Sequence, residues 1–296
     1  IRDRFMKHRI RKILLVCCSY DGYILEEDGH IEQQINQEYI DLNMSNPPSL
    51  TRVSSTAEAL EALDRDDSFD FILTMYNVGE PDVFDFAKIV KERHRHIPVV
   101  LLTSFSKDIY RRIDERDASG IDYIFSWSGN TDLVIGIIKL IEDAMNAEED
   151  ILTGGVQAIL LVEDSVRFYS SILPHLYKFL LRQSMLFSTE ALNEHEKMLR
   201  MRGRPKVLLA RTYEEARELY DKYSDKMLGL ITDVSFMRDG AKDPLAGISF
   251  SEYVRANYPY LPIIVESTES SNRRYCDRFG GIFLDKTSKK LPVDLG

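Results

Sequence analysis

Residues that would indicate a secreted or membrane protein are scarce in this sequence. Only 3 of its 296 residues are cysteine (Cys17, Cys18 and Cys276), and two of these are adjacent, so a disulfide framework is excluded. No apolar run approaches the roughly 20 residues that cross a membrane, and no signal peptide opens the chain. These absences predict a protein of the reducing cytoplasm.

Positive charge is in the minority as well. The chain has 38 Lys and Arg against 48 Asp and Glu, a formal net charge of −10, which argues against a surface built to coat nucleic acid. Residues 1–12 are locally basic, and we interpret them as a solvated helix end rather than a nucleic-acid arm. No Gly-x-Gly-x-x-Gly follows Val16 or Val162, which excludes a nucleotide-binding Rossmann enzyme. The 6 histidines show no catalytic spacing.

The sequence contains the same succession of segments twice. Its length favours two domains, and its 44% apolar and 29% charged residues are typical of globular chains. In both halves, short apolar segments that predict buried strands alternate with helical stretches, two of which begin with capping boxes at Ser55 and Thr212. The matching segments are 13–16 and 159–162, 72–75 and 230–233, 98–103 and 262–267, and 123–126 and 283–286. The repeat predicts two α/β domains with parallel sheets, at 1–147 and 156–296.

Reactive side chains follow four of the predicted strands in the second copy. They are Glu163 and Asp164 after 158–162, Asp233 at the end of 229–233, Ser267 at the end of 261–267, and Lys286 after 282–285. In an open α/β sheet, ligands bind beyond the carboxyl ends of the strands. Adjacent carboxylates repel one another unless a cation lies between them, and oxygen ligands favour a hard ion such as Mg²⁺. With a lysine suited to a phosphoryl oxygen, this set predicts a phosphoryl-accepting site.

Through these residues, 158–290 resembles the receiver domain of two-component response regulators. The resemblance implies that Asp233 is the phosphoacceptor and that Lys286 and Ser267 contact the phosphoryl group. Phe283 stands where the family has an aromatic residue that switches together with the hydroxyl. For both copies the resemblance implies a flavodoxin-like (βα)5 fold with a five-stranded parallel sheet. Thr287 departs from the family, which usually has proline at that position.

The resemblance also implies a metal site. Glu163, Asp164 and Asp233 match the acidic residues of the family that hold Mg²⁺, and the backbone carbonyl of Ser235 would supply a further ligand. A hydrolase of the haloacid-dehalogenase kind likewise combines a nucleophilic Asp with Mg²⁺. That class requires a second Asp two residues after the nucleophile, where this chain has Ser235, so we disfavour it.

The chemistry is not repeated in the first copy. Cys17 and Cys18 stand where the second copy has its acid pair, and no further Cys or His lies at ligand spacing, so we expect buried apolar residues rather than a metal site. Met75 replaces the acceptor, and Ser126, or Trp127 if the register shifts by one, replaces the lysine. Thr103 matches Ser267, so the hydroxyl group is kept in the first copy. The first copy is therefore predicted to be a pseudo-receiver.

The second copy carries two insertions. Residues 166–202 form an apolar-patterned segment around Pro174 that would be a helix roughly 54 Å long if continuous. A docking or dimer surface and a helix pair folded back on itself both fit this segment. Residues 240–247 enlarge the loop after the acceptor, and we expect Asp239 and Asp243 to be solvated rather than ligating.

Both ends of the sequence are those expected of a fragment. The helix at 132–145 is predicted to be the fifth of the first domain, whereas the second domain stops at Gly296 with a truncated last helix. Apolar surface near Leu160, Val162 and Phe283 would then be open, and we expect 166–202 of the same or a second chain to cover it, giving a homodimer.

The leading functional hypothesis is a signalling module rather than an enzyme that turns over a substrate. Its partners would be a histidine kinase or phosphotransfer protein and an output domain beyond the sequence. The alternative is a phosphorylation-independent interaction or dimerisation module that regulates a fused enzyme. A looser resemblance, at 23–29 and 199–205, to the module ahead of phosphoenolpyruvate-synthase-like (PEP/pyruvate-binding) domains implies such an enzyme.

Overall fold

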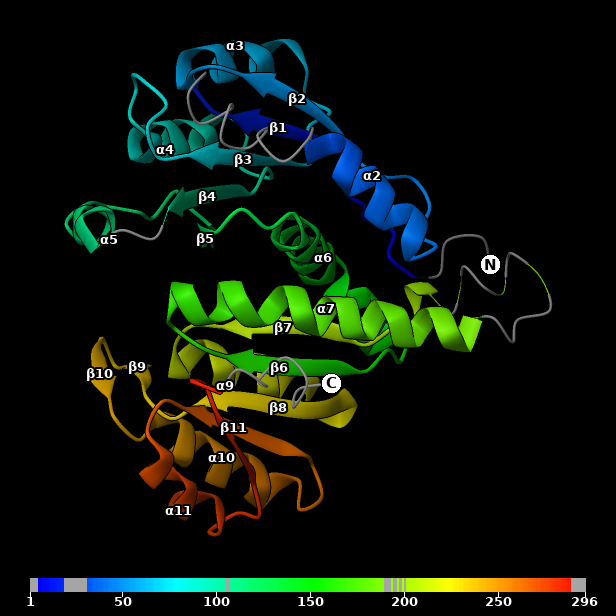
Figure 1. Ribbon diagram of the computed structural model, residues 1–296, viewed down its shortest axis with the longest axis vertical. Coiled ribbons are helices and arrows are strands. Elements are labelled where there is room, and N and C mark those ends of the chain that lie inside the picture. Colours follow the sequence, from blue (N-terminus) through cyan, green and yellow to red (C-terminus); the bar gives the residue numbers. More distant parts are fainter. Residues whose placement is uncertain are drawn as a thin grey trace. The chain divides into compact units, whose positions relative to one another are not determined.

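The computed structural model describes residues 5–18, 31–104, 107–188 and 201–288, together with the single positions 193, 196 and 199. By its internal contacts the chain divides into two units, Arg9–Ile135 and Gly136–Gly296 with Ile1–His8. The division falls within the helix α6 (Asp132–Ala147), upstream of the expected domain end at residue 147. Each unit contains one five-stranded sheet (Figure 1).

The sheet of the first unit has the strand order β2-β1-β3-β4-β5, and all its pairings are parallel. Its elements are β1 (Lys12–Val16), α2 (Ile31–Asp41), β2 (Ser49–Val53), α3 (Thr56–Arg65), β3 (Phe71–Met75), α4 (Val83–Arg93), β4 (Val99–Ser104), α5 (Lys107–Asp114) and β5 (Tyr123–Trp127). The predicted capping box begins α3, because the Glu58 backbone N–H donates to Ser55 Oγ at 3.2 Å.

The sheet of the second unit has the order β12-β11-β8-β6-β7, which is the same order read from the opposite edge. Its elements are β6 (Ala158–Val162), α7 (Val166–Ser188), β7 (Lys206–Ala210), α9 (Tyr213–Tyr223), β8 (Met227–Asp233), β9 (Phe236–Arg238), β10 (Ala241–Asp243), α10 (Ala246–Asn257), β11 (Ile263–Ser267), α11 (Arg273–Cys276) and β12 (Ile282–Asp285). In each sheet the first strand in sequence lies between the second and third, as in flavodoxin-like folds. The predicted fold class is confirmed.

Helices cover both faces of the second sheet. Because crossovers between parallel strands are right-handed, α7 lies on one face and α9 and α10 lie on the other (Figure 1). Phe250 of α10 packs edge-on against Tyr213 and Tyr220 of α9, with ring centroids 5.9 and 6.1 Å apart. The carboxyl ends of the strands remain at one edge, where the loops that follow them meet.

Helix α7 accounts for the first part of the long insertion. Pro174 lies inside it and does not end it. Most positions between 189 and 200 lie outside the described residues, so the choice between one long helix and a helix pair stays a prediction. Within the described part of the chain, no helix combines the length and apolar character that crossing a membrane would require.

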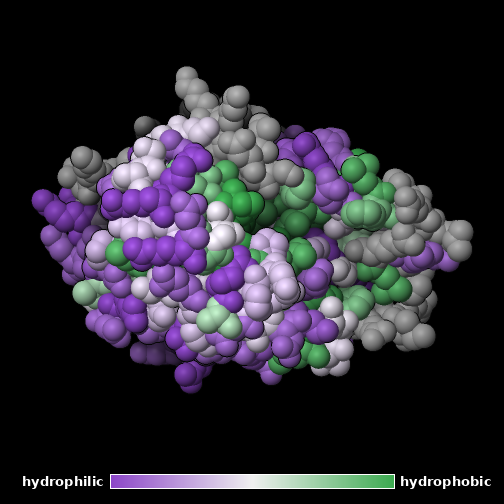
Figure 2. Space-filling view, turned by 90° about the horizontal axis from the view of Figure 1, so that it is seen from below, coloured by the Kyte–Doolittle hydropathy of each residue, from purple (hydrophilic) through white to green (hydrophobic). Residues whose placement is uncertain are grey.

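The three residues expected to border an apolar gap in the second sheet are covered. Leu160 and Val162 are fully buried and Phe283 is only 9% exposed, whereas Ile282, beside Phe283, is 60% exposed. Ala147 and Ile151, which precede β6, belong to the same buried cluster as Leu160 and Val162. The end of α6 and the π-helical turn Glu148–Thr153 therefore help to complete this core. The face shown in Figure 2 is mainly hydrophilic, with apolar residues in small groups. The homodimer stays a prediction.

A buried ionic cluster ties the end of α6 to the start of β7. Asp143 accepts hydrogen bonds from Arg204 Nη1 and Nη2 at 3.0 and 2.8 Å, from the Val207 backbone N–H at 2.9 Å and from Tyr177 Oη at 2.8 Å. The side chain of Asp143 is fully buried and that of Arg204 is 1% exposed. A buried carboxylate is stable in the folded state only when charged or hydrogen-bonding partners compensate its charge, so removing one partner of such a cluster is destabilising.

We expect Asp143→Ala to lower the free energy of unfolding by about 3–5 kcal/mol, because it leaves Arg204 buried without its counter-ion. Urea unfolding of the full chain followed by circular dichroism measures the loss. The control is Glu148→Ala, which removes the exposed pair of Glu148 with Lys222 and should change stability little. Equal effects of the two substitutions would contradict the structural role of Asp143.

Candidate functional site

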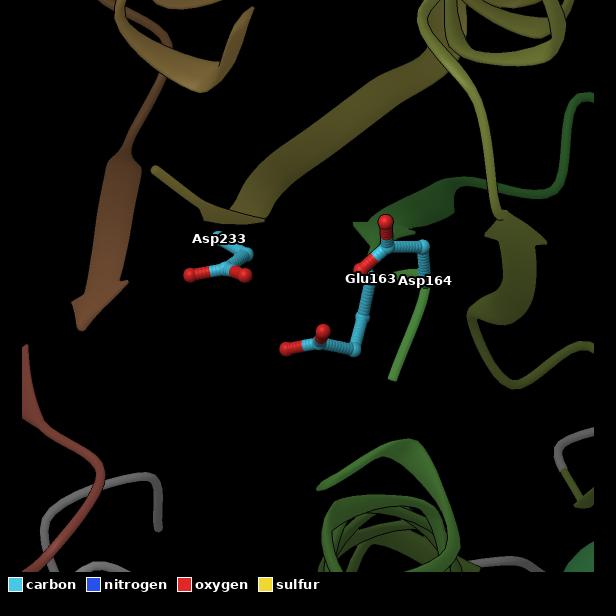
Figure 3. Close-up of side chains that lie close together, drawn as sticks. All are labelled: Glu163, Asp164 and Asp233. Atoms are coloured by element: carbon cyan, nitrogen blue, oxygen red, sulfur yellow. The ribbon is translucent and has the colours of Figure 1, made fainter. Parts of the chain in front are cut away.

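Three carboxylates meet at the carboxyl ends of β6 and β8. Glu163 and Asp164 directly follow β6, and Asp233 is the last residue of β8. Val162 and Thr232 are paired, so the next residue of each strand lies at the same level of the sheet. One oxygen from each carboxylate lies within 4.8 Å of the others. Figure 3 shows all three side chains extending into the space beyond the strand ends.

Lys286 reaches these carboxylates from the end of β12. Its Nζ pairs with the Glu163 carboxylate and lies 3.1 Å from Asp233 Oδ1. The lysine side chain is 2% exposed, and the ring of Phe168 lies 4.2 Å from Nζ. Burial lowers the pKa of Lys286, but the attraction of Glu163 and Asp233 outweighs burial and raises the pKa above its ordinary value. The lysine is therefore held as a cation against Asp233.

Two lysines face the three carboxylates, because Lys242 Nζ lies 2.8 and 2.7 Å from the oxygens of Asp164 while Lys286 pairs with Glu163 and Asp233. Burial raises the pKa of Glu163 to about 7, with the attraction of Lys286 opposing the shift and the charge of Asp233 adding to it. Asp164 and Asp233 keep 16% and 15% of their side chains exposed. The set contains only oxygen donors, which fits a hard divalent cation such as Mg²⁺.

The loop after the acceptor depends on a glycine that the sequence pattern did not single out. Ser235 lies in the bend between β8 and β9, as the family resemblance requires. The backbone N–H of Gly247 in α10 donates to the Val234 carbonyl at 2.9 Å. A Cβ atom at Gly247 would lie 1.8 Å from the carbonyl oxygen of Asp233, so no other residue fits there without displacing the acceptor.

The two predicted switch residues lie on the neighbouring strands β11 and β12. Ser267 ends β11, and its Oγ accepts from the Glu269 backbone N–H at 3.1 Å and from Asn272 Nδ2 at 2.9 Å. In both bonds the oxygen of the hydroxyl group is the acceptor. Phe283 is buried on β12, with the Arg273 guanidinium carbon 5.1 Å from the centre of its ring. Movement of these side chains stays a prediction.

A fourth carboxyl group, Glu266, was not predicted as a site residue. It is paired with Asp233 in the register of β11 and β8, and it is fully buried. Among the described residues, neither of its carboxyl oxygens has a hydrogen-bond partner. Burial raises the pKa of Glu266 to about 8, and the nearby Glu163 and Asp233 add to the shift while Lys286 opposes it. The only sequence signal was a carboxylate inside an otherwise apolar strand.

The strand register settles which residue of the first sheet matches Lys286. Thr103 of β4 pairs with Ser126, and the matching Ser267 of β11 pairs with Asp285. The next residue is Trp127 in the first sheet and Lys286 in the second, so the equivalence with Ser126 is wrong and the alternative, Trp127, is correct. Cys17 and Cys18 follow β1 as the acid pair follows β6, and Met75 ends β3 as Asp233 ends β8.

The raised pKa of Glu266 predicts a pH dependence of stability. The folded state holds the proton up to about pH 8, against an ordinary value of 4.5, so its stabilising contribution is complete below about 4.5 and is lost as the pH rises through about 8. We expect the wild-type free energy of unfolding to fall across this window, by at most about 1.4 kcal/mol per pH unit from this group. The free energy of unfolding of the Glu266→Gln variant should fall less steeply with pH.

Urea unfolding at a series of pH values measures this slope. The control is Glu269→Gln, since Glu269 is an exposed carboxyl three residues further on. Parallel pH profiles for the wild type and Glu266→Gln would contradict the burial of an ionisable Glu266.

The chain has distant structural likenesses among solved proteins. No protein-family model and no curated protein matches the chain. Two solved response-regulator/GGDEF domain proteins, each 18% identical, align over 96% of this chain and 94% and 95% of theirs, with TM-scores of 0.37 and 0.38. A phosphorylated cyanobacterial phytochrome response regulator is 22% identical and aligns over 45% of this chain and 91% of its own, with a TM-score of 0.31. The resemblance to the phosphoenolpyruvate-synthase module finds no support in these matches.

These structural likenesses are distant, and the chain's own topology and residues are more informative. Both sheets have the receiver strand order. Within the described residues, the second sheet brings together Glu163, Asp164, Asp233 and Lys286. The chain thus contains two sheets with the same strand order, and the second gathers three carboxylates and a lysine at the carboxyl ends of its strands.

Proposed function

We propose that the second unit accepts a phosphoryl group on Asp233 and serves as the receiver of a two-component signalling system. The observation that supports this role is the convergence of Asp233 with two further carboxylates and a buried lysine at one sheet edge. The donor would be a phosphohistidine of a histidine kinase or phosphotransfer protein. A module with such partners would work in the cytoplasm.

In the transfer, an oxygen of the Asp233 carboxylate attacks phosphorus. A P–O bond forms while the P–N bond to the donor imidazole breaks, and the imidazole nitrogen takes up a proton. Lys286, 3.1 Å from Asp233 Oδ1, would contact a phosphoryl oxygen as negative charge gathers there. Mg²⁺ held by Glu163, Asp164, Asp233 and the Ser235 carbonyl would offset the charge of the transferring group.

The acceptor is regenerated when water hydrolyses the acyl phosphate and releases inorganic phosphate. One modification and one hydrolysis make this a signalling cycle rather than turnover of a substrate. Between the two events, the Ser267 hydroxyl would donate to a phosphoryl oxygen. Phe283 on the adjacent strand would then move with Ser267 and change the surface offered to a partner or output domain.

We expect the full chain to gain one phosphoryl group after treatment with acetyl phosphate and Mg²⁺, and Asp233→Asn to gain none. Intact-mass spectrometry measures the uptake. Asp239→Asn, an exposed acid in the following turn, is the matched control and should be modified like the wild type. Undiminished uptake in Asp233→Asn would refute the assignment. A wild type that takes up no phosphoryl group would favour the phosphorylation-independent module instead.

The first unit should remain unmodified under the same conditions. Cys17, Cys18 and Met75 supply no carboxylate at the strand ends where a cation and a phosphoryl group would bind. Peptide mapping of the treated full chain should locate the modification at Asp233 alone. A phosphorylated peptide from residues 9–135 would show that the first unit is not a pseudo-receiver.

A further inference from the structure

A second lysine reaches the acceptor site from the hairpin formed by β9 and β10. Lys242 of β10 places its Nζ 2.8 and 2.7 Å from the two carboxylate oxygens of Asp164. Asp164 is one of the three carboxylates that fit a divalent cation. Lys242 therefore occupies both oxygens of a predicted metal ligand.

The position of Lys242 follows from how the hairpin is anchored. Lys242 pairs with Met237 in the antiparallel β9–β10 ladder, and Met237 forms a β-bridge with Thr212, the residue before α9. At the turn, the Asp239 backbone N–H donates to Glu214 Oε1 at 2.9 Å. These contacts fix the backbone of the hairpin against the start of α9, so the lysine is directed to Asp164 by the fold.

The two lysines of the site differ in burial. Lys286 is 2% exposed and lies beneath the ring of Phe168, so it cannot leave without opening the core. The side chain of Lys242 is 52% exposed. Its long flexible stem can withdraw into water while the hairpin stays in place. Lys242 is therefore the positive charge of the site that can be exchanged.

We propose that Lys242 competes with the divalent cation for Asp164 and thereby sets the affinity of the site for that cation. The inference rests on the proposed function, because the same carboxylates hold the cation. While Lys242 spans both oxygens of Asp164, an arriving cation meets a like charge a few ångströms away and must displace an ion pair. On binding, Asp164 exchanges the ammonium group for the metal.

Isothermal titration calorimetry of the full chain with Mg²⁺ alone tests the proposal. Lys242→Met keeps the length of the side chain and removes its charge, and it should bind Mg²⁺ about three- to tenfold more tightly than the wild type. Lys242→Arg keeps the charge and should bind like the wild type.

The matched control is Lys222→Met, which removes the same charge from an exposed lysine of the same unit, paired with Glu148. Since Lys222 does not contact the carboxylates, we expect its affinity change to stay below about twofold at physiological ionic strength.

The outcomes separate this inference from the proposed function. Equal affinities of Lys242→Met and Lys222→Met, or weaker binding by Lys242→Met, would overturn the competition while Mg²⁺-dependent uptake at Asp233 still stands. If Lys242→Met binds Mg²⁺ and the wild type shows no Mg²⁺ binding, the result would support competition by Lys242 most strongly. Absence of Mg²⁺ binding in every variant would overturn both.

Discussion

The repulsion among carboxyl groups at one edge of the second sheet is the constraint to which the surrounding structure responds. Strand pairing places Asp233 of β8 beside Glu266 of β11 and at the level of Glu163, which directly follows β6, so the three cannot move apart without breaking the sheet. Burial favours the protonated forms of Glu163 and Glu266, and Lys286 offsets part of the remaining charge. The charge of Asp164 is paired with Lys242, and a divalent cation would have to displace that lysine to bind all three carboxylates.

The first sheet shows the same strand order without that constraint. Cys17, Cys18 and Met75 stand where the second sheet has acids, and they can be packed without a counter-ion. The two sheets therefore share an architecture but differ in the electrostatics of one edge. A fold of this kind provides the edge, and the residues placed there decide whether it can take part in phosphoryl transfer.

Burial also separates two ionic arrangements within the second unit. Asp143 and Arg204 are enclosed and bound by several partners, so their pair is a fixed part of the structure. Asp164 and Lys242 are held at similar distances but remain open to water, so their pair can be exchanged for another cation. Separating the buried charges of Asp143 and Arg204 costs more free energy than separating Asp164 from the exposed Lys242. The first pair therefore stabilises the structure, and the second is suited to regulation.

The sequence by itself determined the repeated fold and the central residues of the site. Parallel strands all end at one edge of a sheet, so a residue that directly follows an apolar strand, such as Asp233 or Lys286, is placed there by the chain alone. Tertiary packing decided what local patterns do not encode. Lys242 meets Asp164 across 78 residues through a hairpin anchored on α9, and Ile151 fills a core that the strand pattern left open. Trp127 takes the place of the lysine because register depends on pairing between strands and not on the period within one strand.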